Sequence, residues 1–112
     1  MTTALSSYLL LAAAIFFEVV WAVALKMSNG FTVLWASVLT AVAYVLSLVF
    51  LSFASKNMDI SIAYALWAGM GIAGIAFCGI VFLHEPFSPL RGLGFFLVIA
   101  GVALLAGLER AA

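Results

Sequence analysis

The sequence predicts an all-α membrane protein with four transmembrane helices, and three observations support this fold class. Of the 112 residues, 69% are apolar and only 7% are charged, whereas about 25% of residues are charged in an ordinary soluble domain. Four predominantly apolar runs reach the length of about 20 residues that a bilayer span requires. Short polar segments separate these runs. Because four spans use almost the whole sequence, we expect one transmembrane domain over residues 1–112.

Local signals set the limits of the four spans. Ser28-Asn29-Gly30 suits a helix C-terminus, because Gly accepts the left-handed conformation of the cap. Residues 56–59 form a polar hinge, Glu85-Pro86 stops the third run, and Ser88-Pro89 reads as an N-cap followed by Pro at the first helical position. The first run is too long for a secretory signal and contains Glu18. The expected spans are about 5–27, 32–55, 60–83 and 88–108.

The few charges at the membrane surfaces give no preferred orientation. Four spans place Lys56 and Arg110 on one side of the bilayer and Lys26 and Arg91 on the other. Orientation normally follows an excess of Lys and Arg on the cytoplasmic side, and two against two is no excess. A chain of this kind can insert both ways, so we expect an antiparallel, dual-topology homodimer with a two-fold axis.

Glu18 is the only acidic residue within the first span. A charged group at mid-membrane costs at least a few kcal/mol, so an ionisable residue there indicates function by default. Residues three and four apart share a helix face, which places Trp21 one turn from the carboxylate. Aromatic, hydroxyl and small residues on the second and third spans are expected to complete a box around Glu18. With Trp21, the lining residues are Ser47, Tyr64 and Trp67, and behind them Ala14, Tyr44, Ala68 and Gly71.

This constellation suits an organic cation, which a carboxylate and aromatic rings attract through ion pairing and cation–π contact. Burial disfavours the charged form of Glu18, and a second copy nearby disfavours it further, so the two groups would titrate as a pair. The pair would hold either protons or the cation. Exclusive occupancy of one site that opens alternately to each side is sufficient for proton-coupled antiport.

The fourth span contains no intramembrane charge and carries Gly94 and Gly101 seven residues apart. Small residues allow close approach of membrane helices, so we interpret this stripe as the dimer seam. Several other classes of function are disfavoured. Cys78 is the single cysteine, and the sequence has no metal-ligand spacing, phosphate loop or basic nucleic-acid patch. We therefore expect no enzyme activity, no metal and no cofactor other than protons as the coupling ion.

Three features together resemble the small multidrug resistance family. They are the stretch from Glu18 to Phe31, the segment from Ile62 to Gly71, and the pair Gly94 and Gly101. The resemblance covers essentially the whole chain. It implies an antiparallel four-helix homodimer, or a paired heterodimer, that exchanges protons for cations in the bacterial inner membrane. It also implies that Glu18 is the shared carboxylate, that Tyr64 and Trp67 form the wall of the site, and that the glycines form the seam.

Trp21 and Ser47 resemble the guanidinium exporter subtype, in which these residues hydrogen-bond the carboxylates. Ile15, Ala68 and the segment 61–64 depart from that subtype and make the site more apolar. Guanidinium offers N–H donors to carboxylates, whereas a quaternary ammonium relies on apolar and aromatic contact. Guanidinium or substituted guanidiniums are the expected substrates. A quaternary ammonium exporter, a non-transporting partner subunit of a membrane complex and a proton channel remain alternatives.

Overall fold

The computed structural model describes residues 2–111, with side chains over residues 5–108. It contains four long α-helices: α1 (Thr2–Met27), α2 (Leu34–Ala54), α3 (Ile60–Phe82) and α4 (Pro89–Ala111), with a short 3₁₀ turn, η1 (Ser55–Asn57), after α2. Each of the four is long and apolar enough to cross a membrane, so the predicted all-α, four-helix fold class is confirmed. Arg110, which entered the charge count, lies outside the described side chains.

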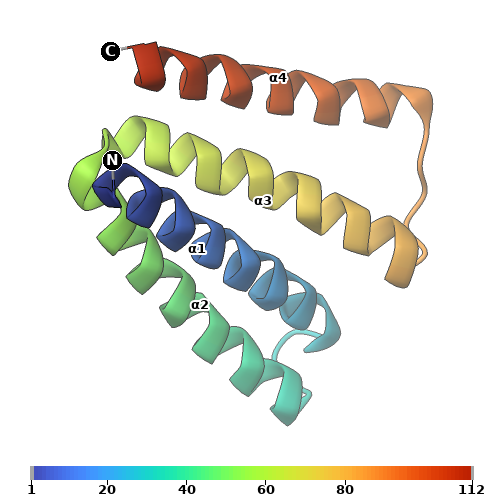
Figure 1. Cartoon of the computed structure of the whole chain (residues 1–112). Coiled ribbons are helices and arrows are strands. Elements are labelled where there is room, and N and C mark those ends of the chain that lie inside the picture. The colour runs from blue at the N-terminus through green and yellow to red at the C-terminus, as the bar shows by residue number, and fades with distance from the viewer. Residues whose placement is uncertain (1, 112) are drawn as a thin grey trace.

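The four helices lie side by side in the order α4, α3, α1, α2 (Figure 1). The molecule measures 45 × 34 × 18 Å, so it is a slab less than two helix diameters thick. Helix α1 begins and helix α4 ends at one end of the slab, as an even number of spans requires, and the α1–α2 and α3–α4 connections lie at the other (Figure 1).

The helix ends follow the polar signals in the sequence, with small differences. Asn29, Gly30 and Phe31 all have positive φ angles, so the predicted left-handed cap extends over three residues. The second helix starts at Leu34, two residues later than expected, because the Ser28 side chain organises this turn: its hydroxyl donates to the Leu25 carbonyl at 2.7 Å and accepts the Phe31 amide at 3.1 Å.

The start of α4 uses the predicted cap, since the Arg91 amide donates to the Ser88 hydroxyl at 3.2 Å. At the start of α3, Asp59 occupies the N-cap position, but its side chain makes no capping hydrogen bond. The backbone carbonyl of Asp59 instead accepts the amides of Ile62 and Ala63.

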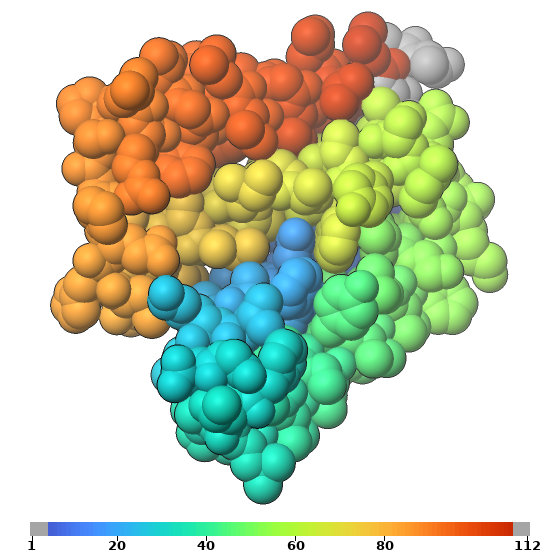
Figure 2. Space-filling model, turned by 180° about the vertical axis from the view of Figure 1, so that it is seen from behind, coloured from blue at the N-terminus to red at the C-terminus, as the bar shows by residue number. Residues whose placement is uncertain are grey.

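The packed core lies mainly between α1, α2 and α3, and Val102 of α4 joins it against Gly69 of α3. It is built from small and medium-sized side chains and includes Trp67; its buried apolar members are Leu11, Ala14, Leu51, Ala54, Ile62, Ala63, Leu66, Trp67 and Val102. Viewed from behind, α1 forms the floor of a trough between α2 and α3 (Figure 2). This arrangement brings residues of three helices together along α1, where Glu18 lies.

Candidate functional site

Glu18 is buried in the middle of α1, with 7% of its surface exposed. Its carboxylate packs against Gly71 of α3, where a Cβ atom would overlap both carboxylate oxygens, and one turn further along α3 Gly74 makes room for Val19 in the same way. Gly is required at position 71 for this close approach, since any larger residue would displace the carboxylate. Oε1 of Glu18 has no hydrogen-bond partner among the described residues.

Trp21 lies one turn beyond Glu18, as predicted, but its indole turns toward α2. The ring packs edge-on against Tyr44, with 5.2 Å between ring centroids and an interplanar angle of 87°. Nε1 of Trp21 is buried and, within the described part of the chain, has no hydrogen-bond partner. Two buried polar atoms in adjacent turns of α1 therefore remain unsatisfied within one copy of the chain, and such atoms are rare in folded proteins.

Ser47 joins the three core helices through its hydroxyl group. Nε1 of Trp67 on α3 donates to Ser47 Oγ at 2.9 Å, and the hydroxyl donates to the Ala14 carbonyl on α1 at 2.7 Å. A serine hydroxyl has one proton to donate, so in this conformation it has none left for Glu18. The carbonyl of Ala14 is also the i−4 acceptor position for the Glu18 amide in a regular helix. The network therefore ends one turn from the carboxylate.

Tyr64 and Trp67 of α3 pack together, with ring centroids 5.2 Å apart and an interplanar angle of 61°. Trp67 is buried, whereas Tyr64 is 55% exposed. Ala68 is partly buried beside them and belongs to the shell around the core. The phenol of Tyr64 is therefore the accessible part of this aromatic pair.

The predicted site residues thus form three neighbouring groups on α1–α3. Glu18 packs on Gly71, Trp21 packs on Tyr44, and Ser47 links Trp67 to Ala14. The structure does not bring Trp21 or Ser47 into hydrogen-bond contact with Glu18 within one chain. A pocket of about 440 Å³ flanks the Trp21 group and is lined by Trp21, Leu25, Phe31, Thr40, Ala41 and Tyr44.

Sequence reasoning overlooked Ser7. This residue is buried, and its hydroxyl oxygen lacks a partner among the described residues. It lies on one stripe of α1 with Leu11, Ala14 and Glu18, at the helical spacing of four, three and four residues. The signal was present in the sequence as the one hydroxyl residue on an otherwise apolar stripe that leads to the carboxylate.

The predicted seam residues Gly94 and Gly101 lie on α4, away from the Glu18 group. Apart from the neighbouring residues and backbone of α4 itself, no described atom lies within 4 Å of the position that a Cβ would take at either glycine. A shallow cleft of about 430 Å³ between α3 and α4 is lined by Ile72, Arg91, Gly94, Phe95 and Val98. The side of α4 that carries the two glycines is therefore open in a single chain.

Comparison with known proteins assigns this four-helix chain to a family. The family described as "Small Multidrug Resistance protein" matches residues 6–103. The chain belongs to the small multidrug resistance family. Members similar to it include the guanidinium exporter of Salmonella typhimurium strain LT2, which is 44% identical over 96 residues, or 86% of this chain and 91% of the relative. The guanidinium exporters of Citrobacter freundii and Klebsiella oxytoca are each 42% identical over the same shares.

Family membership and the four apolar helices together locate the protein. This small multidrug resistance protein is a multi-pass protein of the bacterial inner membrane. Its Glu18 therefore lies within a bilayer and not in the interior of a soluble bundle. Bilayer hydrocarbon offers no hydrogen-bonding partner to the unsatisfied atoms of Glu18 and Trp21.

Proposed function

We propose that this protein exports small organic cations, most favourably guanidinium or substituted guanidiniums, in exchange for protons. The observation that carries the proposal is the buried Glu18 carboxylate, which has an unsatisfied oxygen within the membrane. An ionised group in that position requires a positive partner, and a neutral one requires a proton. Cation and proton are therefore alternative occupants of the same group.

The names of the relatives support guanidinium as the cation, since all three compared relatives are guanidinium exporters. Guanidinium is planar and donates paired N–H groups, which match the geometry of a carboxylate. The exposed Tyr64 side chain and the unsatisfied indole N–H of Trp21 offer further polar groups for the cation. The apolar pocket next to Trp21 suits an alkyl or aryl substituent on the guanidinium.

The functional unit in this proposal is an antiparallel homodimer, in which residues 1–112 of each copy form one transmembrane domain. A second, oppositely inserted copy brings a second Glu18 to the trough and covers the open glycines Gly94 and Gly101 of α4. Two carboxyl groups release two protons when one monovalent cation binds. The exchange then moves one net charge, and alternating access of the shared site carries cation and protons in opposite directions.

The two carboxylates, Trp21, Ser47, Tyr64 and Trp67 are the proposed substrate-site residues, with Ala14, Tyr44, Ala68 and Gly71 behind them. In this arrangement Ser47 donates to Glu18 only by rotating its hydroxyl proton away from the Ala14 carbonyl, whereas its oxygen, which accepts one bond from Trp67, has a second lone pair to accept an N–H group of the cation. A hydrogen bond from Ser47 to Glu18 therefore competes with the Ser47–Ala14 hydrogen bond that joins α2 to α1. No cofactor other than the coupling protons enters the proposed mechanism.

A quaternary ammonium exporter is the second candidate, and a specific feature favours it. Ala68 and Ile15 offer no hydroxyl or other polar group beside the core aromatic residues. A quaternary ammonium has no N–H donor and gains from apolar and aromatic surface alone. Such a site would bind tetraalkylammonium more tightly than guanidinium.

Transport by the purified protein in vesicles separates these candidates. Electrical current and internal pH are recorded while guanidinium, phenylguanidinium and tetrapropylammonium are applied in turn. We expect currents and coupled proton movement with the first two. Current with tetrapropylammonium alone would replace the proposed substrate, proton flux without any substrate would indicate a channel, and no flux with any cation would favour a non-transporting subunit.

A further inference from the structure

A second hollow lies between the last turns of α1 and α3 and the first turns of α2. Its volume is about 500 Å³, larger than that of the pocket beside Trp21. No charged or hydroxyl side chain lines it. The lining residues of this apolar groove are Phe16, Val19, Val20, Val23, Ala24, Met27, Trp35, Leu39, Cys78, Phe82 and Leu83.

The apolar groove faces away from the proposed transport site. Successive residues of an α-helix are separated by about 100°, so four of the α1 residues that line the groove, Phe16, Val20, Val23 and Met27, lie about 140–180° around α1 from Glu18. The other two, Val19 and Ala24, lie about 100–120° from it. The stripe that carries Glu18 is buried against α2 and α3, whereas this stripe forms one wall of the groove. An occupant of the groove therefore does not compete with a cation at Glu18.

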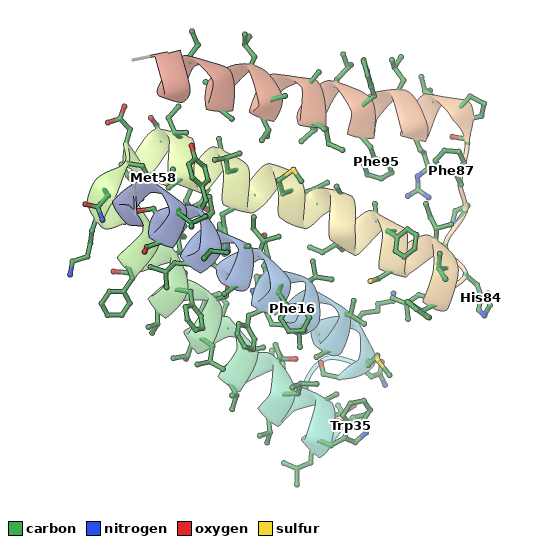
Figure 3. All side chains as sticks on the ribbon, in the orientation of Figure 1. Phe16, Trp35, Met58, His84, Phe87 and Phe95 are labelled. Atoms are coloured by element: carbon green, nitrogen blue, oxygen red, sulfur yellow. The ribbon has the colours of Figure 1, made fainter. Side chains whose placement is uncertain are left out.

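The groove has the length and direction of one leaflet of the bilayer. On α1 it extends from Phe16 to Met27, which is about 16 Å at 1.5 Å per residue, close to half of the roughly 30 Å hydrocarbon thickness. Figure 3 shows Phe16 midway along the bundle and both Trp35 and His84 at the end where α1 and α3 terminate. Trp35 is 57% exposed, and tryptophan is typical of the membrane interface.

Water is a poor occupant of this groove, because a bound water needs two or more polar partners. An empty groove would also forfeit the contacts of its lining atoms. A second copy of the chain is a poorer fit than lipid. In the proposed dimer, the partner contacts the opposite side of α1 and the open face of α4, and not the groove. The flexible hydrocarbon chain of a lipid meets the remaining requirements of shape and polarity.

Charge at the outer end of the groove matches a lipid phosphate. Lys26 is exposed in the last turn of α1, seven residues after Val19 and three after Val23, which both line the groove. At the same end, the Glu85 carboxylate packs over Gly79 of α3, and the Arg91 guanidinium donates to the Pro86 carbonyl. Lys26 is therefore the cation placed beside the mouth.

We propose that the apolar groove binds an acyl chain of a membrane phospholipid, whose phosphate group pairs with Lys26. The chain lies along α1 from Met27 toward Phe16, with its end near mid-membrane. The protein so acquires one ordered lipid per copy on the side opposite to Glu18. In a dual-topology dimer, the two lipids lie in opposite leaflets.

Photo-crosslinking in vesicles tests this proposal with the full-length protein. The probe is phosphatidylglycerol with a photoreactive diazirine midway along one acyl chain, and the modified residues are identified by mass spectrometry. We expect crosslinks to concentrate on the groove residues Val20, Val23 and Cys78. Crosslinks spread evenly over the exposed side chains of all four helices would overturn the proposal.

Filling the groove supplies the matched comparison. Val23→Trp places bulk within it, whereas Val45→Trp adds the same bulk at an exposed position on α2 outside the described pockets. We expect crosslinking at Cys78 to fall at least fivefold in the first variant and to stay unchanged in the second. Equal yields in the two variants would contradict acyl-chain binding.

The charge step is tested separately, with variants that leave the groove open. Lys26→Gln is expected to lower the crosslinking yield of phosphatidylglycerol about fivefold, the effect of one lysine near an anionic lipid surface, and Lys26→Arg is expected to restore it. An unchanged crosslinking yield in Lys26→Gln would contradict the proposed pairing of the lipid phosphate with Lys26. A bifunctional maleimide that joins Cys78 of two copies, in place of lipid crosslinks, would assign the groove to a second chain.

Discussion

Helices α1–α3 and helix α4 use similar apolar sequences in different ways. In the most hydrophobic window of each span, 22–28% of the residues of α1, α2 and α3 are buried, against 6% in α4. The first three helices pack around one another and hold every proposed substrate-site residue. Helix α4 contacts mainly α3. The part of the chain that carries the site therefore makes most of its contacts internally, whereas most of the surface of α4 stays exposed in one copy.

Glycine shows the same difference at single positions. At Gly71 and Gly74 of α3, the side chains of Glu18 and Val19 fill the space that a Cβ atom would take. Gly94 and Gly101 of α4 face open space in one copy. One pair is a contact already made within the chain, and the other is a surface that remains available. Substitutions that distinguish these two uses separate the site from the assembly.

Removing the charge of Glu18 is expected to have the largest effect. Glu18→Gln keeps the side-chain volume and abolishes the group that alternates between proton and cation, so guanidinium-driven proton movement should fall to the background of protein-free vesicles. Glu85→Gln, at an exposed glutamate outside the spans, is the control and should retain transport. Residual coupled transport in Glu18→Gln would show that another group carries the proton.

The pH dependence of the unmodified protein belongs to the same prediction. Protons and cation compete for Glu18, so the concentration of guanidinium needed for half-maximal binding should rise as the pH falls. Isothermal titration across a series of pH values measures this change. Binding that is independent of pH would contradict competition at the carboxylate.

The next largest effect is expected from substitutions on the exposed face of α4. Gly101→Leu introduces bulk on the proposed seam, so we expect the dimer fraction in reconstituted vesicles to fall at least tenfold. Transport should be lost with the dimer, while α1–α3 remain folded. Gly107→Leu is the control, because position 107 lies about 120° around the helix from the seam and is also open. Single-molecule photobleaching in vesicles counts the copies, and circular dichroism reports the helices. An intact dimer in Gly101→Leu would place the seam elsewhere.

The substitution Gly71→Ala alters the contact that already exists. The added methyl group overlaps the Glu18 carboxylate, so the carboxylate must move, and we expect transport to decrease about tenfold with the dimer preserved. A displacement of about 1 Å at a reacting group commonly has an effect of that size or larger. Gly107→Ala provides the matched control. Loss of the dimer in Gly71→Ala would mean that the glycine serves assembly and not the site.

Much of the fold and part of the site follow from the sequence, for identifiable reasons. Span length and polar breaks predict the four helices because the bilayer imposes one length on every span. Helical spacing correctly places Trp21 one turn from Glu18, but it cannot fix the rotamer that turns the indole toward Tyr44. The contact between Gly71 and Glu18 depends on the tertiary approach of α1 and α3. Spacing within one helix contains no information about that approach.

Ser47 illustrates the same limit. The sequence marks it as a hydroxyl on an apolar span, whereas only the structure shows that its proton goes to the Ala14 carbonyl and that Trp67 donates to it. Both acceptor and donor belong to other helices. The apolar groove was missed for a related reason, since its walls come from three helices whose relative tilt is not encoded in any local pattern.

The smallest expected effect concerns this hydrogen-bond chain. Ser47→Ala leaves the buried indole N–H of Trp67 without its partner, and we expect a loss of about 0.5–1.5 kcal/mol in the free energy of unfolding, in the range measured for hydrogen bonds within membranes. Ser37→Ala is the matched control, because the Ser37 hydroxyl donates to the Val33 carbonyl of its own helix. Its substitution should cost less, since no second helix is involved.

A double-mutant cycle of Ser47→Ala with Trp67→Phe then isolates the bond between the two side chains. If the Trp67 N–H and the Ser47 hydroxyl stabilise each other, the double variant is more stable than the sum of the two single effects predicts, because neither partner is left unsatisfied. Unfolding by denaturant in mixed micelles measures each free energy. Strict additivity would show that Ser47 acts only through Ala14, so that its hydroxyl links α1 to α2 and the Trp67 N–H has no part in positioning the turn before Glu18.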